Sequence, residues 1–405
     1  MRFGLQCRRC GKQKPFEPAK TTCACGGSLQ VAYDLERAGR TLRTDALHGR
    51  VHSMWRYAEL LPVERSAHIV SLGEGWTPLL ALEERARDLG LGALQVKCEE
   101  RNPTGSFKAR GASAALSVAR AHGLRRIAIN SNGNAASAAA AYAARAGMEA
   151  FAFLPADCPG AIVAECVQYG ARTCLVDGLI HDAGRLIREG RDEQGWHFIG
   201  TLQEHGRAEG KKTMGLELAE QLGWRLPDVI VYPTGGGSGI IGMWRAFAQL
   251  RALGLIDGDL PRMVSVQAQG CAPIADAMRS GGNYVPLRGV VTSPPTGMRV
   301  PLPPDGEQLL AILRASGGTG VSVSEAEIAD GARELGRCGV SASPEGAATW
   351  AGLLRLVDSG WIAPGERVVL FNTSHSGKYL PWRMEGVPCV KNYAAWRKLD
   401  QESAR

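Results

Sequence analysis

The sequence predicts an α/β protein built on parallel strands. From residue 125 onward, short apolar runs alternate with helical stretches, an order typical of helices that connect parallel strands. The 405 residues allow two or three structural units, and the 45% hydrophobic content is ordinary for a soluble globular protein. No apolar run approaches the ~20 residues that span a bilayer, so we expect no membrane segment.

The first 45 residues contain four of the eleven cysteines, in two close pairs: Cys7 and Cys10, then Cys23 and Cys25. Two such pairs can close a tetrahedral thiolate site, for which zinc is the default metal. The segment between the pairs is polar and offers little core, so a bound metal would stabilise it. Four free cysteines are the alternative. The other seven are scattered singly, which suits a reducing cytosol and predicts a cytoplasmic protein.

The next segments lead to a run centred on a lysine. Residues 35–60 are charged and helical in character, and residues 71–79, which include Thr77, form a loop punctuated by glycine and proline. Residues 94–97 read as a strand and residues 112–120 as a helix.

Between that strand and that helix, residues 102–111 read Asn-Pro-Thr-Gly-Ser-Phe-Lys-Ala-Arg-Gly. Ser106 is predicted to cap the helix, which places Lys108 in its first turn. The positive end of the helix dipole disfavours a charged lysine there. A lysine with a lowered pKa is what Schiff-base chemistry requires, because only the neutral amine attacks an aldehyde. The alternative is an ordinary solvated lysine.

Further along, the alternation continues. Strands are predicted at 127–129, 150–154, 173–176, 229–232, 263–266 and 368–371, with helices at 135–146 and 163–169. Residues 289–305, rich in proline, glycine and valine, are predicted to form an irregular loop.

Two loops after predicted strands could hold anions. Residues 130–135 form a strand-to-helix turn with free backbone N–H groups. Residues 233–242 are rich in glycine, which lets the backbone approach a phosphate. They also satisfy a dinucleotide fingerprint, but that site requires an acidic residue after the next strand, where Gln267 stands. We therefore favour the phosphate of another cofactor.

The lysine run resembles the cofactor motif of the fold-type-II pyridoxal-phosphate enzymes (the tryptophan synthase β-like superfamily), most closely that of the threonine synthases. The one departure is Ala109, where that family has aspartate. The loop at 71–79 matches as well, and the cysteine segment looks like the zinc-ribbon-like leader of some threonine synthases. The resemblance covers nearly the whole chain.

The resemblance implies a fold of two open, twisted, three-layer α/β lobes and a homodimer. Residues 1–45 would form the zinc-ribbon-like leader and the start of a linker. Residues 46–120 and 206–405 would form the large cofactor-binding lobe, and residues 121–205 a smaller mobile lobe.

The resemblance also implies roles for individual residues. Lys108 would bind pyridoxal phosphate as a Schiff base and later move the α-proton. The implied cofactor contacts are Lys108, Asn134, Gly235, Gly236, Gly237, Ser238, Gly239 and Thr373. The implied substrate contacts are Ser131, Asn132, Gly133, Thr77 and, for the distal anion of the substrate, Arg207. His375 is expected to have no catalytic role.

Threonine synthases convert O-phosphohomoserine and water to threonine and phosphate, and the resemblance implies that activity. Ala109 departs from the family, as do Thr201 and Leu202, which stand where some members have an Asn-Ser pair. An alternative is therefore a diverged enzyme that performs β-elimination or β-replacement on another anionic amino acid, similar to a threonine or serine dehydratase or to a cysteine or cysteate synthase.

A third possibility is a non-catalytic protein that binds nucleic acid. The net charge is only +7, and the lysines and arginines are dispersed. The leader also lacks interleaved basic and aromatic residues. We therefore expect a small amino-acid substrate rather than a nucleic-acid partner.

Overall fold

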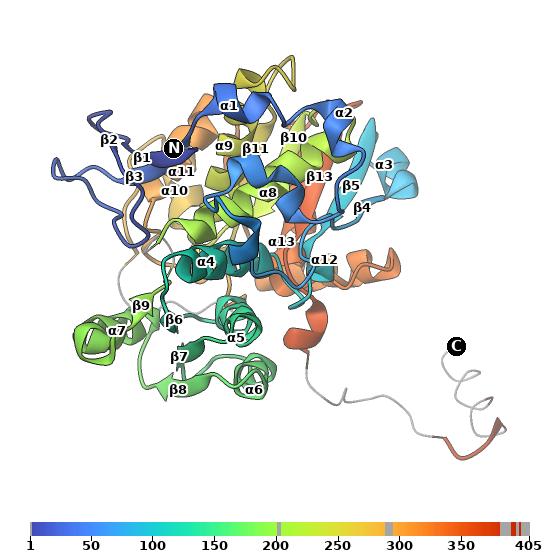
Figure 1. Cartoon of the computed structure of the whole chain (residues 1–405). Coiled ribbons are helices and arrows are strands. Elements are labelled where there is room, and N and C mark those ends of the chain that lie inside the picture. The colour runs from blue at the N-terminus through green and yellow to red at the C-terminus, as the bar shows by residue number, and fades with distance from the viewer. Residues whose placement is uncertain (1, 201–203, 288–294, 381–389, 394–396, 398–405) are drawn as a thin grey trace.

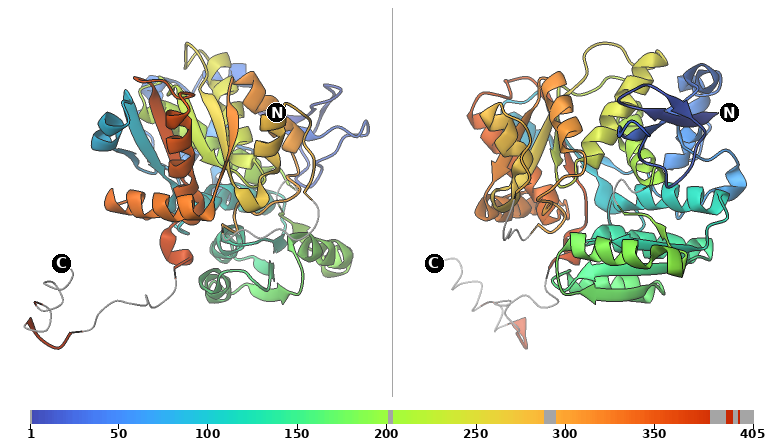
Figure 2. Two further views of the ribbon diagram at one scale, coloured as in Figure 1. Left: turned by 180° about the vertical axis from the view of Figure 1, so that it is seen from behind. Right: turned by 90° about the vertical axis from the view of Figure 1, so that its left-hand side faces the viewer.

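The computed structural model describes residues 2–200, 204–287, 295–380, 390–393 and 397, and within them the chain forms three β-sheets. A six-stranded sheet has the order β12-β11-β10-β13-β5-β4, and a four-stranded sheet has the order β8-β7-β6-β9. A three-stranded sheet near the N-terminus has the order β2-β1-β3. Figures 1 and 2 show the four-stranded sheet and its helices, coloured green, lying beneath the body that contains the six-stranded sheet.

The six-stranded sheet is parallel except for β4, which pairs antiparallel with β5. The predicted strands at 94–97, 229–232, 263–266 and 368–371 are confirmed. The strand at 319–323 has no predicted counterpart, because its sequence is short, partly polar and interrupted by glycine. The six strands are β4 (Leu79–Ala81), β5 (Ala93–Cys98), β10 (Val229–Pro233), β11 (Arg262–Ala268), β12 (Thr319–Val323) and β13 (Arg367–Asn372).

Helices cover both faces of this sheet and give three layers. Alternate residues of one strand serve the two faces: Ile230 packs with one group of helices, whereas Val229 and Val231 pack with the other. The first group is α8 (Gly206–Gln221), α9 (Ser238–Ala252), α10 (Pro273–Ser280) and α11 (Gly306–Ala315). The second is α3 (Glu83–Asp88), α12 (Glu325–Arg337) and α13 (Pro344–Asp358).

The four-stranded sheet is parallel throughout. The strands and helices predicted between residues 127 and 176 are all present, whereas the two-residue strand β9 is too short to leave a pattern. The strands are β6 (Arg126–Asn130), β7 (Glu149–Pro155), β8 (Arg172–Val176) and β9 (His197–Phe198), and the helices are α5 (Asn134–Ala146), α6 (Gly160–Gln168) and α7 (Ile180–Gln194).

Helix α4 (Lys108–Ala121) contributes to the core of the four-stranded sheet and also packs closely on α8. A Cβ atom on Gly210 of α8 would lie 2.1 Å from the carbonyl oxygen of Arg110 in α4. A Cβ on Gly215 would lie 3.0 Å from the Cα of Met243 in α9. Glycines therefore allow α8 to lie between α4 and α9 at close range.

The N-terminal sheet, coloured dark blue in Figure 1, consists of β1 (Phe3–Cys7), β2 (Gln13–Lys14) and β3 (Leu29–Tyr33). It packs around its own small core, which includes Leu5 and Val31. The ring of Phe16 lies 5.8 Å from that of His205, and His205 Nε2 lies 2.8 Å from the carbonyl oxygen of Lys20. The leader therefore contacts the main body where α8 begins.

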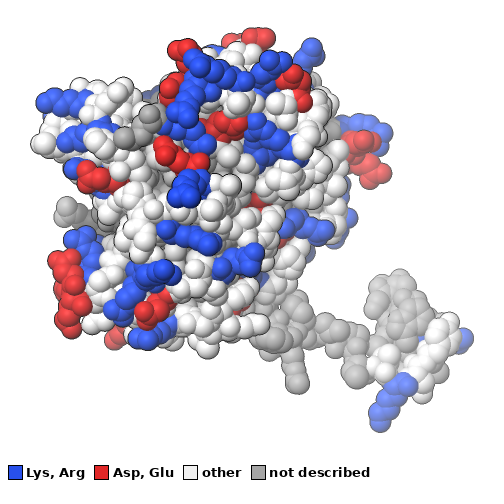
Figure 3. Space-filling view, viewed as in Figure 1, with Lys and Arg blue, Asp and Glu red and all other residues white. Residues whose placement is uncertain are grey.

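Short helices α1 (Leu35–Gly39) and α2 (Thr44–Leu47) follow the leader, within the segment predicted to be helical. Of the predicted irregular loop at 289–305, residues 295–305 contain no helix or strand, and residues 289–294 lie outside the described part. In the described ranges, no helix is both long and apolar enough to cross a membrane. On the face shown in Figure 3, basic and acidic side chains are interspersed.

Candidate functional site

One pocket gathers all eight residues that were predicted to contact the cofactor. It lies where β10 and β13 end and where α4, α5 and α9 begin, so loops from both large sheets contribute to it. The pocket is lined by Lys108, Asn134, Gly235, Gly236, Gly237, Ser238, Gly239 and Thr373, and also by Phe107, Tyr232, Pro233, Gly297, Met298, Glu345, Ser374 and Tyr379.

Lys108 is the first residue of α4 and so lies in its first turn, as predicted, but Ser106 does not cap the helix. The residue that precedes the helix is Phe107, and the buried Ser106 hydroxyl has no hydrogen-bond partner among the described residues. The reason is the path of the backbone. Ser106 pairs with Ser374 in an antiparallel bridge, and the Phe107 N–H donates to the carbonyl of Thr373 at 3.0 Å.

The surroundings of Lys108 favour a neutral amine. Burial and the nearby Arg207 cation lower the pKa of Lys108 to about 7, against the opposing effect of the Glu345 carboxylate. Its Nζ lies 4.4 Å from the centre of the Phe107 ring. A lysine with these properties can act as a nucleophile toward an aldehyde near neutral pH.

Asn134 is the first residue of α5, and it connects the two sheets across the pocket. Its Nδ2 donates to the Ser374 hydroxyl at 3.0 Å and to the Tyr379 hydroxyl at 2.8 Å. Its Oδ1 is buried and has no partner in the part of the chain that the structure describes. Buried polar atoms are rarely left without a hydrogen bond, so this oxygen marks a place for a polar group in the pocket.

The glycine loop connects β10 to α9, and several of its residues leave no room for a side chain. A Cβ on Gly235 would lie 2.4 Å from the carbonyl oxygen of Gly297, and one on Gly239 would lie 2.3 Å from the Tyr232 ring. Gly237 has a φ of +75°, which side-chain-bearing residues rarely adopt. The loop ends at the start of a 15-residue helix, where free N–H groups and the helix dipole favour an anion.

The predicted carboxylate ligands Ser131, Asn132 and Gly133 precede Asn134 but do not line the pocket itself. The Ser131 hydroxyl accepts from the Gly133 N–H at 3.0 Å, and the Asn132 amide donates to the carbonyl of Arg299 at 3.3 Å. Their role toward a substrate stays a prediction.

Thr77 lies apart from the pocket, in a buried network of charged groups. Its hydroxyl donates to Glu99 at 2.8 Å, and its N–H donates to Glu217 at 2.7 Å. Arg110 pairs with both carboxylates, at 2.7 and 2.8 Å, and Lys97 pairs with Glu217. All of these partners are buried, and no contact in the described chain ties Thr77 to the pocket residues, so its predicted substrate role gains no support.

Arg207 lies in the first turn of α8 and is buried close enough to Lys108 to lower the pKa of that lysine. Its Nη1 donates to the carbonyl of Ile199 at 2.7 Å. The nearby carboxylate of Glu204 accepts from the Arg207 backbone N–H at 2.7 Å, and burial raises the pKa of Glu204 to about 7. Thr201 and Leu202, the two departures from the family in this stretch, lie outside the described residues.

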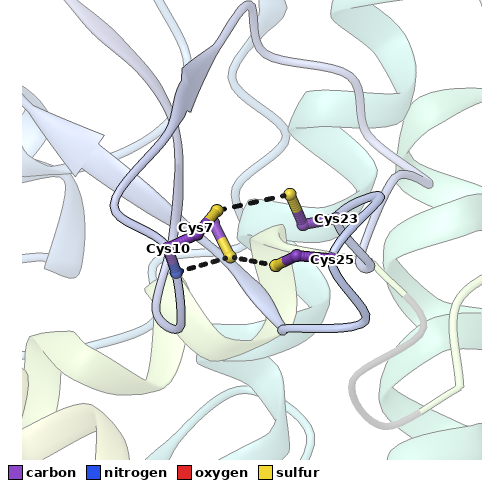
Figure 4. Close-up of side chains that lie close together, drawn as sticks. All are labelled: Cys7, Cys10, Cys23 and Cys25. Atoms are coloured by element: carbon purple, nitrogen blue, oxygen red, sulfur yellow. Dashed lines mark hydrogen bonds between the residues drawn. The ribbon is translucent and has the colours of Figure 1, made fainter.

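The four leader cysteines lie together, as the sequence predicted (Figure 4). Their sulfur atoms all lie within 4.8 Å of one another, with Cys7 to Cys25 at 3.5 Å and Cys10 to Cys23 at 3.9 Å. Sulfur atoms at ~2.3 Å from a tetrahedral zinc ion would lie about 3.8 Å apart. The four thiols therefore lie close enough together to hold one metal ion.

Four residues of the pocket were missed by the sequence prediction and make specific contacts there. Ser374 and Tyr379 accept hydrogen bonds from Asn134, and Glu345 accepts from the Gly297 N–H at 2.9 Å. Ser374 follows Thr373 directly, so its place in the loop after β13 could have drawn attention to it. Glu345, Tyr379 and Gly297 carry no such signal.

Residues 70–374 match the protein-family profile described as pyridoxal-phosphate dependent enzyme. Threonine synthase from Methanocaldococcus jannaschii is 34% identical over 379 residues, which cover 92% of each chain. The enzyme of the same name from Methanosarcina acetivorans is 35% identical over 92% of this chain and 91% of its own.

Solved structures share the fold. Maize serine racemase superposes with a TM-score of 0.63 at 22% identity, covering 81% of this chain and 92% of that one. A threonine deaminase from T.th. superposes with a TM-score of 0.61 at 25% identity, covering 75% of this chain and 94% of its own.

Proposed function

Because the chain belongs to the pyridoxal-phosphate-dependent enzyme family, we propose that it is a threonine synthase, a lyase that converts O-phosphohomoserine and water to threonine and phosphate. The observation that carries the proposal is one pocket in which Lys108, the glycine loop, Asn134 and Thr373 meet. The name shared by relatives that are 34–35% identical over 92% of this chain supports it.

The pocket residues fit pyridoxal phosphate. Lys108, with a pKa of about 7, supplies an amine that can react with the aldehyde of the cofactor. The start of α9 supplies N–H groups suited to its phosphate. Asn134 Oδ1, buried in the pocket without a partner among the described residues, leaves a hydrogen bond for a further polar group to make.

When bound, pyridoxal phosphate supplies an electron sink that makes the α-carbon proton of an amino acid acidic. Lys108 Nζ is the group that would take and return protons there, because a base with a pKa near the operating pH transfers protons efficiently in both directions. Asn134, fixed by Ser374 and Tyr379, would orient the reacting groups. Thr373, at the end of β13, would offer its hydroxyl to the ring nitrogen.

The substrate carries two anionic groups, and we assign its distal phosphate to Arg207. Arg207 is buried close to Lys108, which places a guanidinium beside the reacting amine. A guanidinium pairs well with a phosphate through charge-assisted hydrogen bonds. We assign the α-carboxylate to the turn formed by Ser131, Asn132 and Gly133.

At the scale of domains, we propose that residues 121–205 form a mobile lobe that closes on a larger lobe made of residues 46–120 and 206–405. The pocket takes Asn134 from one part and Lys108 from the other, so closure would exclude water from the reacting groups. If the two lobes have the same relative position in structures with and without a bound substrate, the closure is contradicted.

We further propose a cytoplasmic homodimer.

We also propose that Cys7, Cys10, Cys23 and Cys25 bind one structural zinc ion, supported by their sulfur spacing. Four thiolates leave no open coordination position, so chelation should loosen the leader and leave the chemistry intact. Metal analysis of protein kept reduced should return one equivalent of zinc. Well under half an equivalent would contradict the site, and Cys174→Ser, at an exposed cysteine outside the cluster, is the control.

A second candidate is a dehydratase-like enzyme that releases a keto acid from serine or threonine. The shared fold and 25% identity with a threonine deaminase favour it, as does Ala109 in place of the aspartate of the threonine synthase motif.

A substrate screen separates the two candidates. Purified, cofactor-loaded protein is incubated with O-phosphohomoserine, O-phosphoserine, serine or threonine, and phosphate, threonine and keto acid are measured. We expect equal amounts of phosphate and threonine from O-phosphohomoserine, and no turnover by Lys108→Ala. Faster release of keto acid from serine or threonine than of phosphate from O-phosphohomoserine would overturn the threonine synthase assignment.

A further inference from the structure

Lys211 is a buried lysine with no acidic partner in the described chain. Its side chain is 1% exposed, and its Nζ donates to the Ser238 hydroxyl at 2.8 Å. Other buried lysines of the described chain, Lys97, Lys212 and Lys378, each pair with a carboxylate: Glu217, Glu209 and Glu165. An ammonium group buried without a counter-ion is costly, so Lys211 requires an explanation.

The position of Lys211 connects it to the pocket. A Cβ on Gly111 of α4 would lie 3.4 Å from the Lys211 Cε, and Ser238 is the first residue of α9. The Nζ of Lys211 lies 5.9 Å from the centre of the Phe107 ring, which also lies 4.4 Å from the Nζ of Lys108. The close packing of α8 between α4 and α9 thus carries Lys211 to Ser238 and Phe107, two residues that line the pocket.

The charges around Lys211 favour the binding of an anion beside it. Burial, Arg207 and Lys108 lower the pKa of Lys211 well below its ordinary value, and only Glu204 opposes them. The carboxylate of Glu204 already accepts from the backbone N–H groups of Gly206 and Arg207. A dianion against the start of α9 would lie beside the Lys211 ammonium and would supply the counter-charge.

We propose that Lys211 is the fixed counter-ion of the phosphate held by the glycine loop, and that it makes the pocket selective for the phosphorylated cofactor. The inference rests on the proposed pyridoxal-phosphate site. It is carried by the hydrogen bond to Ser238, which ties Lys211 to that loop and not to the region assigned to the substrate phosphate.

The test compares two forms of the cofactor. Apoprotein is titrated with pyridoxal phosphate and with pyridoxal, which lacks the phosphate, and dissociation constants are read from absorbance. In Lys211→Met, which keeps an unbranched chain one atom shorter and loses the charge, we expect the constant for pyridoxal phosphate to rise about tenfold to a hundredfold. The constant for pyridoxal should change less than about threefold, and Lys211→Arg should recover part of the loss.

Lys212→Met is the matched control, because Lys212 is the adjacent buried lysine and pairs with Glu209 at 2.6 Å. It should lower thermal stability and leave the ratio of the two constants unchanged. If Lys211→Met fails to fold, Lys211→Gln removes the charge and keeps a donor for Ser238, and the same shift is expected.

If the ratio of the dissociation constants for pyridoxal phosphate and pyridoxal is unchanged in the Lys211 variants, the inference is overturned. An unchanged affinity for pyridoxal phosphate together with a raised KM for the phosphorylated substrate would also overturn it, since Lys211 would then serve the substrate phosphate. If wild-type protein binds neither form of the cofactor, the proposed function itself fails, which is a different result.

Discussion

At the scale of single residues, the proposed chemistry depends on the protonation state of Lys108. Burial and the Arg207 cation lower the pKa of Lys108 to about 7, and only the neutral amine attacks an aldehyde. The rate of cofactor attachment to apoprotein should therefore rise with pH, with a midpoint near 7, and level off above it. Stopped-flow absorbance between pH 5.5 and 9 measures this rate.

Two variants test the cause of that midpoint. Arg207→Ala removes a cation and should move the midpoint to higher pH, whereas Glu345→Gln removes an anion and should move it lower. A midpoint near 10 in the wild type, the ordinary range of lysine, would contradict this environment.

Arg207 should decide how well a phosphorylated substrate is used. Its Nη1 is engaged by the Ile199 carbonyl, which fixes the guanidinium while other N–H groups stay available to an anion. Arg207→Ala should lower kcat/KM for O-phosphohomoserine about tenfold to a hundredfold or more, because charge-assisted hydrogen bonds are worth roughly 1.5–3 kcal/mol. Steady-state kinetics measure it.

The absorbance of the bound cofactor should be unchanged in Arg207→Ala. Arg262→Ala is the control for the effect of Arg207→Ala on kcat/KM. Arg262 pairs with Glu366 at the end of β11 that is far from the pocket. If the wild type uses uncharged serine faster than any phosphorylated substrate, Arg207 has another role.

Residue-level prediction from sequence worked where one motif is local. Asn134 and the glycine loop lie within a few residues of a strand end, and Lys108 lies at the start of a helix inside one continuous motif, so a short run contains the information about their position. Glu345 and Tyr379 reach the pocket from α13 and from the segment after β13, and no local pattern encodes that meeting. Ser106 was assigned wrongly as a cap because the backbone pairing of residues 106 and 107 with the loop after β13 is a tertiary feature.

At the scale of elements, the site depends on the close packing of α4, α8 and α9. Gly210→Ala would place a methyl group 2.1 Å from the carbonyl oxygen of Arg110 and force the two helices apart. Overpacking of this kind typically costs about 1–3 kcal/mol. We expect a loss of that size in the free energy of unfolding, measured by urea denaturation, together with weaker cofactor binding.

Gly336→Ala in α12 is the matched control, because the position is helical and a Cβ there meets no atom within 4 Å. It should raise stability by about 0.5–1 kcal/mol, through the higher helix propensity of alanine. Equal effects of the two substitutions would contradict the role of Gly210 in helix packing.

The sequence analysis predicted the strands and helices whose apolar residues form a clear run or stripe. The buried strands β10 and β13 contain continuous apolar runs, and β11 is buried and mostly apolar, whereas β12 at the edge of the sheet is half-buried and mixed in composition. Helix α8 carries buried charged residues on several sides, so it lacks the apolar stripe from which a helix is usually inferred.

At the scale of the whole molecule, the buried network of Arg110, Glu99, Glu217 and Lys97 joins the loop at Thr77 to β5, α4 and α8. Burial raises the pKa of Glu217, but the charges of Arg110 and Lys97 outweigh it and lower that pKa to about 2. A lowered carboxyl pKa contributes stability that is fully present above the unfolded value of about 4.3, and this stability is lost as the pH falls toward 2.

Urea denaturation between pH 7 and 3 should therefore show a steep fall in the free energy of unfolding below about pH 4.5. Glu217→Gln should reduce that slope and should cost about 3–5 kcal/mol at pH 7, because it leaves buried cations unpaired. Asp88→Asn, at an exposed ion pair, should leave the slope as in the wild type. An unchanged slope in Glu217→Gln would contradict the network as the source of acid lability.

The general architecture was predictable because strand–helix alternation and the motif order extend over the whole chain. The division into two sheets was not visible in the alternation alone, since both sheets use parallel strands with connecting helices. Only the resemblance implied two lobes. The placement of the cysteine leader against the start of α8 also depends on tertiary contacts, such as Phe16 with His205, that leave no trace in spacing.

The central claim is that Lys108 forms the covalent bond to pyridoxal phosphate, although another lysine, the buried Lys211, lies close by. Borohydride reduction of the loaded protein, followed by peptide mass spectrometry, locates the bond. We predict one pyridoxyl group per chain, on the peptide that contains Lys108, and none in Lys108→Ala. A label on Lys211, or no label on wild-type protein reconstituted with excess cofactor, would contradict the claim.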